Sequence, residues 1–166
     1  MKRRVFSLLV ENTSGVLSRI AGLFTRRGYN IDSITAGVTA DERYSRITVV
    51  VVEDEILLEQ IEKQLAKLEE VIDIKVLKSG ASVCRELVMV KVSVTQETRQ
   101  EIISVADIFR ANIVDVCTDS LVIELTGNSD KVEAFIKLLE GYEILELART
   151  GITGLSRGTA DVRILD

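Results

Sequence analysis

The stretch that decides the fold is residues 11–34, which read ENTSGVLSRIAGLFTRRGYNIDSI. A β-prone apolar run precedes it at residues 4–10, and residues 12–15 (NTSG) then form a polar turn that also offers a helix cap. The apolar residues that follow recur with the 3.6-residue period of a helix; they are Val16, Leu17, Ile20, Leu23 and Phe24. Gly28 suits the position just after a helix. The pattern therefore predicts a strand, a turn, and a helix that ends near Gly28.

Two strands, a helix and a further strand are predicted after this stretch. Residues 30–38 and 45–53 are rich in β-branched side chains and flank the hydrophilic sequence ADER, which indicates a hairpin. An amphipathic helix is predicted over residues 56–68, and an alternating strand over residues 72–76. The order βαββαβ is typical of a ferredoxin-like sandwich, in which the helices cover one face of the sheet.

The same order of elements returns in the second half of the chain. It is predicted as a strand over residues 86–94, a helix over 98–109, strands over 113–118 and 121–126, a helix over 129–139 and a strand over 144–148. We therefore expect an α+β protein with two ferredoxin-like βαββαβ sandwiches in tandem, with domains at residues 1–78 and 83–166. The Gly-rich residues 149–166 are expected to add an ordered loop or an extra edge strand to the second domain.

The composition argues against several classes of function. The 166 residues include no histidine, so the commonest general base and transition-metal ligand is missing, and no GxxxxGK[ST] phosphate loop occurs. Cys84 and Cys117 lie too far apart for a metal knuckle, and the formal charge of −5 disfavours binding to nucleic acid or to an anionic membrane. The first apolar run is too short for a signal peptide or a spanning helix. We expect no catalytic residues, no metal, no cofactor of its own, and a cytoplasmic location.

The polar turn at residues 12–15 is the candidate functional site. Uncapped amides at a helix N-terminus carry the positive end of the helix dipole and suit the α-carboxylate of a free amino acid. Gly15 permits close approach, and the carboxamides of Asn12 and Asn30 can accept from an ammonium group and donate to a carboxylate. The alternative is purely structural: Asn12 shapes the turn, Gly15 relieves crowding, and Asn30 begins a strand.

Six segments, in the same order along the chain, resemble the small subunit of acetohydroxyacid synthase (acetolactate synthase), a member of the ACT-domain family. They read LVENTSGVLSRIAGLFTRRGYNIDSI, SRITVVV, EQIEKQLAKL, RELVMVKV, ADIFRANIVDV and ARTGITGLSRG. The resemblance implies a regulatory subunit without chemistry of its own, which forms a homodimer through its ACT domain. It would activate the catalytic large subunit and confer feedback inhibition by valine, leucine or isoleucine. Thiamine diphosphate, Mg and FAD are expected in that catalytic partner only.

The resemblance also implies which residues bind the effector amino acid. One protomer would supply Asn12 and the amides around Gly15, Val16 and Leu17, and the other would supply Asn30 and Ile31 across the ACT dimer. Gly37 departs from the family pattern, in which alanine is common, and this leaves the choice among branched-chain effectors open.

Three arginines near the expected site are candidates for contact with the catalytic subunit. They are Arg19, Arg43 and Arg46, and solvated surface charge is the alternative for each of them.

Rival functions fit the sequence less well. An ACT-type regulator of another enzyme or of transcription is the main alternative, but no segment is left over for a DNA-reading helix-turn-helix. An RNA-binding module of the same strand order needs aromatic side chains on its strands, and VFSLLV and ELVMVKV offer only Phe6. A stand-alone enzyme would need an acid–base pair, which we do not find.

Overall fold

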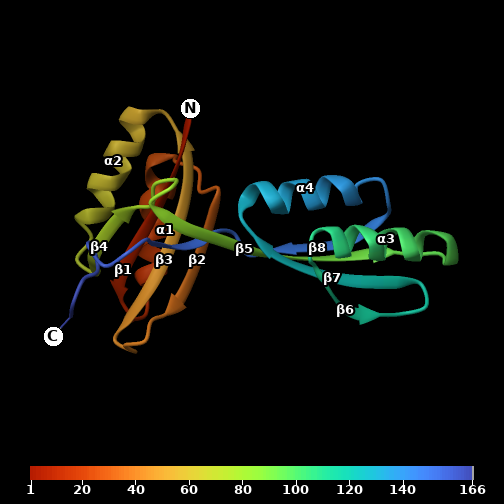
Figure 1. The fold of residues 1–166 in the computed structure, drawn as a ribbon. Coiled ribbons are helices and arrows are strands. Elements are labelled where there is room, and N and C mark those ends of the chain that lie inside the picture. Colours follow the sequence, from red (N-terminus) through yellow and green to blue (C-terminus); the bar gives the residue numbers. More distant parts are fainter. Residues whose placement is uncertain (166) are drawn as a thin grey trace. The chain divides into compact units, whose positions relative to one another are not determined.

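The computed structural model describes residues 1–165, which form two compact units (Figure 1). Unit 1 consists of Met1–Val83 together with the segment that begins at Ile152, and unit 2 consists of Cys84–Gly151. The chain thus leaves unit 1 after Val83 and returns to it after Gly151.

Unit 1 has the predicted order of elements. These are β1 (Lys2–Glu11), α1 (Val16–Arg27), β2 (Ser33–Val38), β3 (Tyr44–Glu53), α2 (Glu55–Ala66) and β4 (Val71–Val76). The strands form an antiparallel sheet in the order β2-β3-β1-β4, so β1 and β3 are central and β2 is an edge strand.

The core of unit 1 lies between the sheet and its two helices. Because side chains alternate along a strand, Phe6, Leu8 and Val10 of β1 all point to one face, where they pack against Ile20 of α1 and Ile61 of α2. All five side chains are almost completely buried. Burial of one such side chain contributes about 1.5–3 kcal/mol, which makes this layer the main source of stability in unit 1.

The opposite face of this sheet is also buried, and the segment that begins at Ile152 lies against it. Leu9 of β1 and Val50 of β3 point away from the helices, yet they are only 5% and 0% exposed. Ile152 is 5% exposed, and its carbonyl accepts a hydrogen bond of 3.1 Å from Thr35 Oγ1 of β2. Further along, Arg163 Nη1 donates to the carbonyl of Ile72 at 2.9 Å.

The predicted extra strand is present as β9 (Thr153–Ser156), which pairs with β5. The sequence-based boundary assigns the whole of residues 83–166 to the second domain, whereas the contacts of this last segment place it in unit 1. The physical reason is that Leu9 and Val50 on the outer face of the unit 1 sheet are apolar and need a cover, and the segment lies against that face (Figure 1).

Unit 2 repeats the same arrangement. Its elements are β5 (Ser82–Ser93), α3 (Gln96–Ile108), β6 (Asn112–Val116), β7 (Ser120–Gly127), α4 (Ser129–Leu139) and β8 (Ile144–Arg149), and its strand order is β6-β7-β5-β8. Both helices cover the same face of the sheet, where Val90 and Ile123 pack against Ile102 of α3 and Phe135 of α4 (Figure 1). The expected fold class, two ferredoxin-like sandwiches in tandem, is confirmed.

Candidate functional site

The turn before α1 leaves the first amides of the helix without a side-chain cap. Gly15 is the N-cap residue, with φ 87° and ψ −9°, and no side chain caps the helix; the first turn contains no acidic residue. The sequence predicts that the turn at residues 12–15 offers a helix N-cap, and Gly15 of this turn is the N-cap residue. In the left-handed conformation of Gly15 the preceding side chains do not reach the amides. The positive end of the helix dipole is therefore not neutralised by a neighbouring side chain.

A glycine is needed at this position because a side chain rarely adopts a φ of 87°. A Cβ built on Gly15 would meet no other heavy atom within 4 Å, so the space around the turn is open. Gly15 itself is exposed. The turn is therefore open to solvent, and ligand binding there stays a prediction of the sequence.

Asn12 ties this turn to the hairpin loop between β2 and β3. Its backbone amide donates to the carbonyl of Arg43, and its Nδ2 donates to the carbonyl of Glu42, both at 2.8 Å. The side-chain amide nitrogen of Asn12 is thus engaged, and its Oδ1 is the atom that can accept from a ligand ammonium group. The sequence alone gives no sign of this contact, because the two segments are thirty residues apart.

An ion pair within the same loop holds it in shape. Arg43 Nη2 lies 2.7 Å from Asp41 Oδ2, and the Asp41 side chain also accepts from the Arg43 backbone amide at 3.0 Å. The hydrogen bond from the Arg43 side chain is the main reason that the pKa of Asp41 lies below its ordinary value. The side chains of Arg43 and Asp41 are 60% and 38% exposed, so the pair orders the loop locally and adds little to global stability.

Val16 and Leu17 begin α1 and face in different directions. The side chain of Val16 is 5% exposed and belongs to the core, whereas Leu17 is 49% exposed. Val16 therefore fixes the start of the helix, and Leu17 offers an apolar surface beside the uncapped amides.

Asn30 and Ile31 lie beyond the opposite end of α1. The helix has 12 residues, which corresponds to a length of about 18 Å. Asn30 is exposed, and Ile31 packs partly against the core. The structure therefore brings Asn12, Gly15 and the start of α1 together within one chain, but it does not bring Asn30 or Ile31 to the same place.

Each of the three candidate arginines has a partner within the chain. Arg19 forms an ion pair with Glu70, a carboxylate that is 8% exposed and follows α2. Arg43 pairs with Asp41 as described above, and Arg46 Nη1 donates to Ser7 Oγ at 3.1 Å. The Arg19–Glu70 pair links the start of α1 to the end of α2, and no sequence pattern indicates it.

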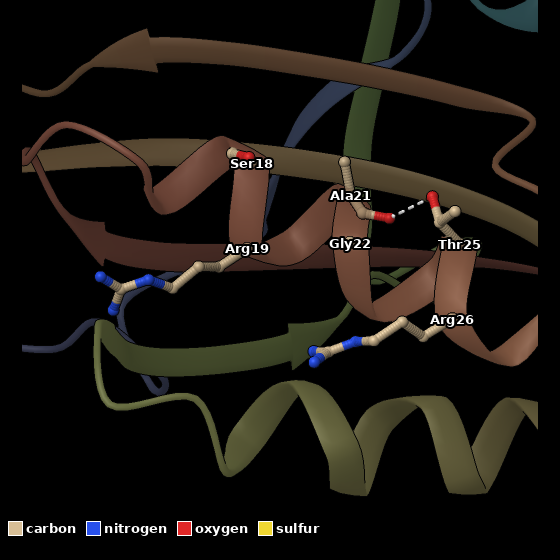
Figure 2. A pocket seen from close by; sticks show the side chains of 6 residues that line it. All are labelled: Ser18, Arg19, Ala21, Gly22, Thr25 and Arg26. Atoms are coloured by element: carbon tan, nitrogen blue, oxygen red, sulfur yellow. Dashed lines mark hydrogen bonds between the residues drawn. The ribbon is translucent and has the colours of Figure 1, made fainter.

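The outer side of α1 is lined by small residues. A shallow hollow there is lined by Ser18, Arg19, Ala21, Gly22, Thr25 and Arg26 (Figure 2). Ser18, Ala21, Gly22 and Thr25 would let another helix approach closely, because they present little side-chain volume. In the same unit, β2 pairs with β3 at one edge of the sheet, and no other strand of residues 1–165 pairs with its other side.

Neither a metal site nor a membrane span emerges from the part of the chain that the structure describes. In residues 1–165, no three histidine, cysteine, aspartate or glutamate side chains are grouped to hold a metal ion. No helix of those residues combines the length and apolar character needed to cross a membrane.

Two family models match the chain. Residues 6–73 match the family described as the AHAS small subunit-like ACT domain, and residues 85–158 match the small subunit of acetolactate synthase. Together the two matches cover nearly all of both ferredoxin-like folds.

Whole proteins with the same description are similar over most of their length. A probable acetolactate synthase small subunit of Methanothermobacter thermautotrophicus is 51% identical over 156 residues, which are 93% of this chain and 93% of that protein. The acetolactate synthase small subunit of Bacillus subtilis is 49% identical over 95% of this chain and 92% of that protein. The crystal structure of an acetolactate synthase small subunit from Thermotoga maritima has a TM-score of 0.87 at 41% identity, and the match covers 95% of this chain and 99% of that one.

Proposed function

The chain belongs to the acetolactate synthase small-subunit family, and from that premise we propose that it regulates a separate catalytic subunit in response to a branched-chain amino acid. The effector is valine, leucine or isoleucine, and it binds at the turn before α1. The catalytic partner supplies all of the chemistry, with thiamine diphosphate, Mg and FAD as its own cofactors. The complex acts in the cytoplasm.

The observation that carries this proposal is the open, uncapped turn at Gly15. A free amino acid is a zwitterion, so its site must accept from an ammonium group and donate to a carboxylate. The first amides of α1 can donate to the carboxylate, and Asn12 Oδ1 can accept from the ammonium group. The half-exposed side chain of Leu17 gives an aliphatic side chain an apolar surface to contact.

A homodimer completes the site. Asn30 and Ile31 lie about 18 Å from the turn along α1, so they can join it only from a second chain. If the α1 helices of two protomers pack antiparallel, Asn30 of one approaches Gly15 of the other. The small residues on the outer side of α1 and the unpaired edge of β2 support this mode of association.

Regulation follows from linkage between the two binding events. The effector favours one arrangement of the ACT dimer, and the catalytic subunit favours the other. Such coupling is typically about 1–3 kcal/mol, and it must be reciprocal for binding, so the partner weakens effector affinity by the same factor. We assign effector binding and dimerisation to residues 1–78. The region after residue 83 and the arginines at positions 19, 43 and 46 are candidates for contact with the catalytic subunit.

Reconstitution tests the function directly. The protein is mixed with an acetolactate synthase catalytic subunit, and acetolactate formation is measured with and without valine, leucine and isoleucine. We expect the protein to raise the activity and one of the three amino acids to lower it again. No change in activity on mixing, with a catalytic subunit that its own small subunit activates, would refute the proposal.

Calorimetry tests the linkage. The affinity for the effector is measured with the regulatory protein alone and with the catalytic subunit at saturation. We expect a five- to 150-fold weaker affinity in the complex, which corresponds to the usual range of about 1–3 kcal/mol. Identical dissociation constants in the two titrations would rule out the two-state mechanism.

A further inference from the structure

A second hollow in unit 1 is lined by residues of both its helices; it lies away from the effector turn and shares only Arg26 with the hollow on the outer side of α1. It is lined by Leu23, Arg26 and Arg27 of α1 and by Gln64, Lys67 and Leu68 at the end of α2. Its volume of about 540 Å³ is that of a small-molecule pocket. Leu23 is buried and Leu68 is half-buried, so the floor is apolar and the charged groups stand at the rim.

The lining of this hollow carries three positive charges and no negative one. Arg26, Arg27 and Lys67 supply the cations, and none of the six lining residues is acidic. Within residues 1–165 no ion pair joins these three side chains to a carboxylate. By contrast, Arg4 and Arg19 of the same unit do pair, with Glu55 and Glu70.

The dipoles of the two helices stabilise each of these three cations separately. Arg26 and Arg27 are in the last turn of α1, and Lys67 is the C-cap residue of α2, so each cation lies at the carbonyl end of a helix. That effect acts on each helix separately and does not require cations from two helices to share one hollow. Figure 2 shows that Arg26 extends from the side of α1 that faces α2, the same side as Arg19. Like charges gathered in this way repel one another unless an anion lies between them.

We propose that the hollow between α1 and α2 binds a small anion that carries two linked phosphate groups. The planar guanidinium groups of Arg26 and Arg27 can each donate two hydrogen bonds to phosphate oxygens, and Lys67 adds a point charge. A phosphate carries roughly −1.5 to −2 at neutral pH, so two linked phosphates match three cations better than one does. The volume of about 540 Å³ favours a small molecule over an extended acidic polypeptide.

Calorimetric titration of the full chain with inorganic diphosphate, at low salt, tests the proposal. We expect saturable binding at one site per chain, and weaker binding of inorganic monophosphate. Valine affinity is measured in the same samples, and we expect it to be unchanged by Lys67→Gln, because Lys67 is not part of the effector turn. The proposed anion site and the proposed effector site can therefore be refuted independently of each other.

A matched pair of variants separates the site from general electrostatics. Lys67→Gln removes one lining cation, and Lys137→Gln removes a cation that is also exposed, in the last turn of α4 in unit 2. Loss of one charge-assisted hydrogen bond weakens binding by roughly tenfold or more, and we expect this for Lys67→Gln and for Arg27→Gln but not for Lys137→Gln. Far-ultraviolet circular dichroism checks that all three variants are folded.

Three results would overturn the proposal. The first is the absence of saturable diphosphate binding to the parent protein. The second is an equal loss of affinity in Lys67→Gln and Lys137→Gln, which would mean that only the net charge matters. The third is saturable binding of polyglutamate together with no competition by diphosphate, which would identify the hollow as a docking groove for an acidic polypeptide.

Discussion

Mixing two defective chains tests whether the effector site is shared between protomers. Asn12→Ala removes a group at the start of α1, and Asn30→Ala removes one beyond its far end, about 18 Å away. In a symmetric dimer of the proposed kind, each of the two sites takes Asn12 from one chain and Asn30 from the other. Both sites of either variant homodimer are then defective, although the folds are intact.

The size of the effect follows from the hydrogen bonds that are lost. A hydrogen bond to a charged group contributes roughly 1.5–3 kcal/mol, so each single variant should bind valine about 10- to 150-fold more weakly. Random exchange of subunits makes about half of the dimers mixed. A mixed dimer has one site with both substitutions and one site with neither. About a quarter of all sites in the mixture should therefore bind with the affinity of the parent.

Calorimetry after subunit exchange measures that fraction. The two variants are mixed in equal amounts, incubated until exchange is complete, and titrated with valine, or with whichever branched-chain amino acid the parent binds. A control mixture contains the parent and the Asn12→Ala/Asn30→Ala double variant. For a shared site about a quarter of the sites are intact in both mixtures. If the site lies within one chain, the first mixture has none and the control has about half, and that result would refute the shared arrangement.

The remaining predictions concern the turn, the covering segment and the hairpin loop. Gly15→Asp should abolish effector binding, because it places a negative charge where the carboxylate of the effector binds. In the same titration Gly15→Asn should weaken binding less, because asparagine has the shape of aspartate without its charge and tolerates the same left-handed backbone. Ile152→Ala should destabilise unit 1 by about 2–5 kcal/mol, which is measured as faster hydrogen exchange in β1 and β3 but not in β7. The control variant Ile164→Ala changes a side chain that is 86% exposed and should have no effect. Faster exchange confined to β7 would contradict the assignment of this segment to unit 1. Asp41→Asn should weaken effector binding by less than Asn12→Ala does. Because the pKa of Asp41 is lowered from 3.8, its carboxylate orders the loop above that pH, and this ordering is lost as the pH falls through the lowered pKa. The effector affinities of the parent and of Asp41→Asn should therefore become equal only in that acidic range. Equal affinities near neutral pH would exclude this role of Asp41.

The helices and strands could be predicted because their signals are local. The apolar period from Val16 to Phe24 and the glycine at position 28 place α1 within a residue or two of its observed ends, and Gly28 has the left-handed conformation of a helix end. The repeat of the βαββαβ order likewise predicts both sandwiches. Such patterns are carried by residues that are near one another in the sequence.

The contacts that complete the site and the sheet could not be predicted, because they join distant segments. Asn12 and Glu42 are 30 residues apart, and Thr35 and Ile152 are 117 residues apart. The missing side-chain cap has a different origin. Asn12, Thr13 and Ser14 are all good capping residues, but the left-handed backbone of Gly15 occupies the capping position itself.

The return of the chain to its first sheet has a consequence for synthesis on the ribosome. Residues 1–83 emerge early, but the segment that begins at Ile152, which lies against the outer face of their sheet, is made last. Cys84–Gly151 must be translated in between, which takes roughly 3 to 14 seconds at 5–20 residues per second. During that interval Leu9 and Val50 lie on a face that lacks this segment, and a ribosome-associated chaperone can bind there until the segment displaces it.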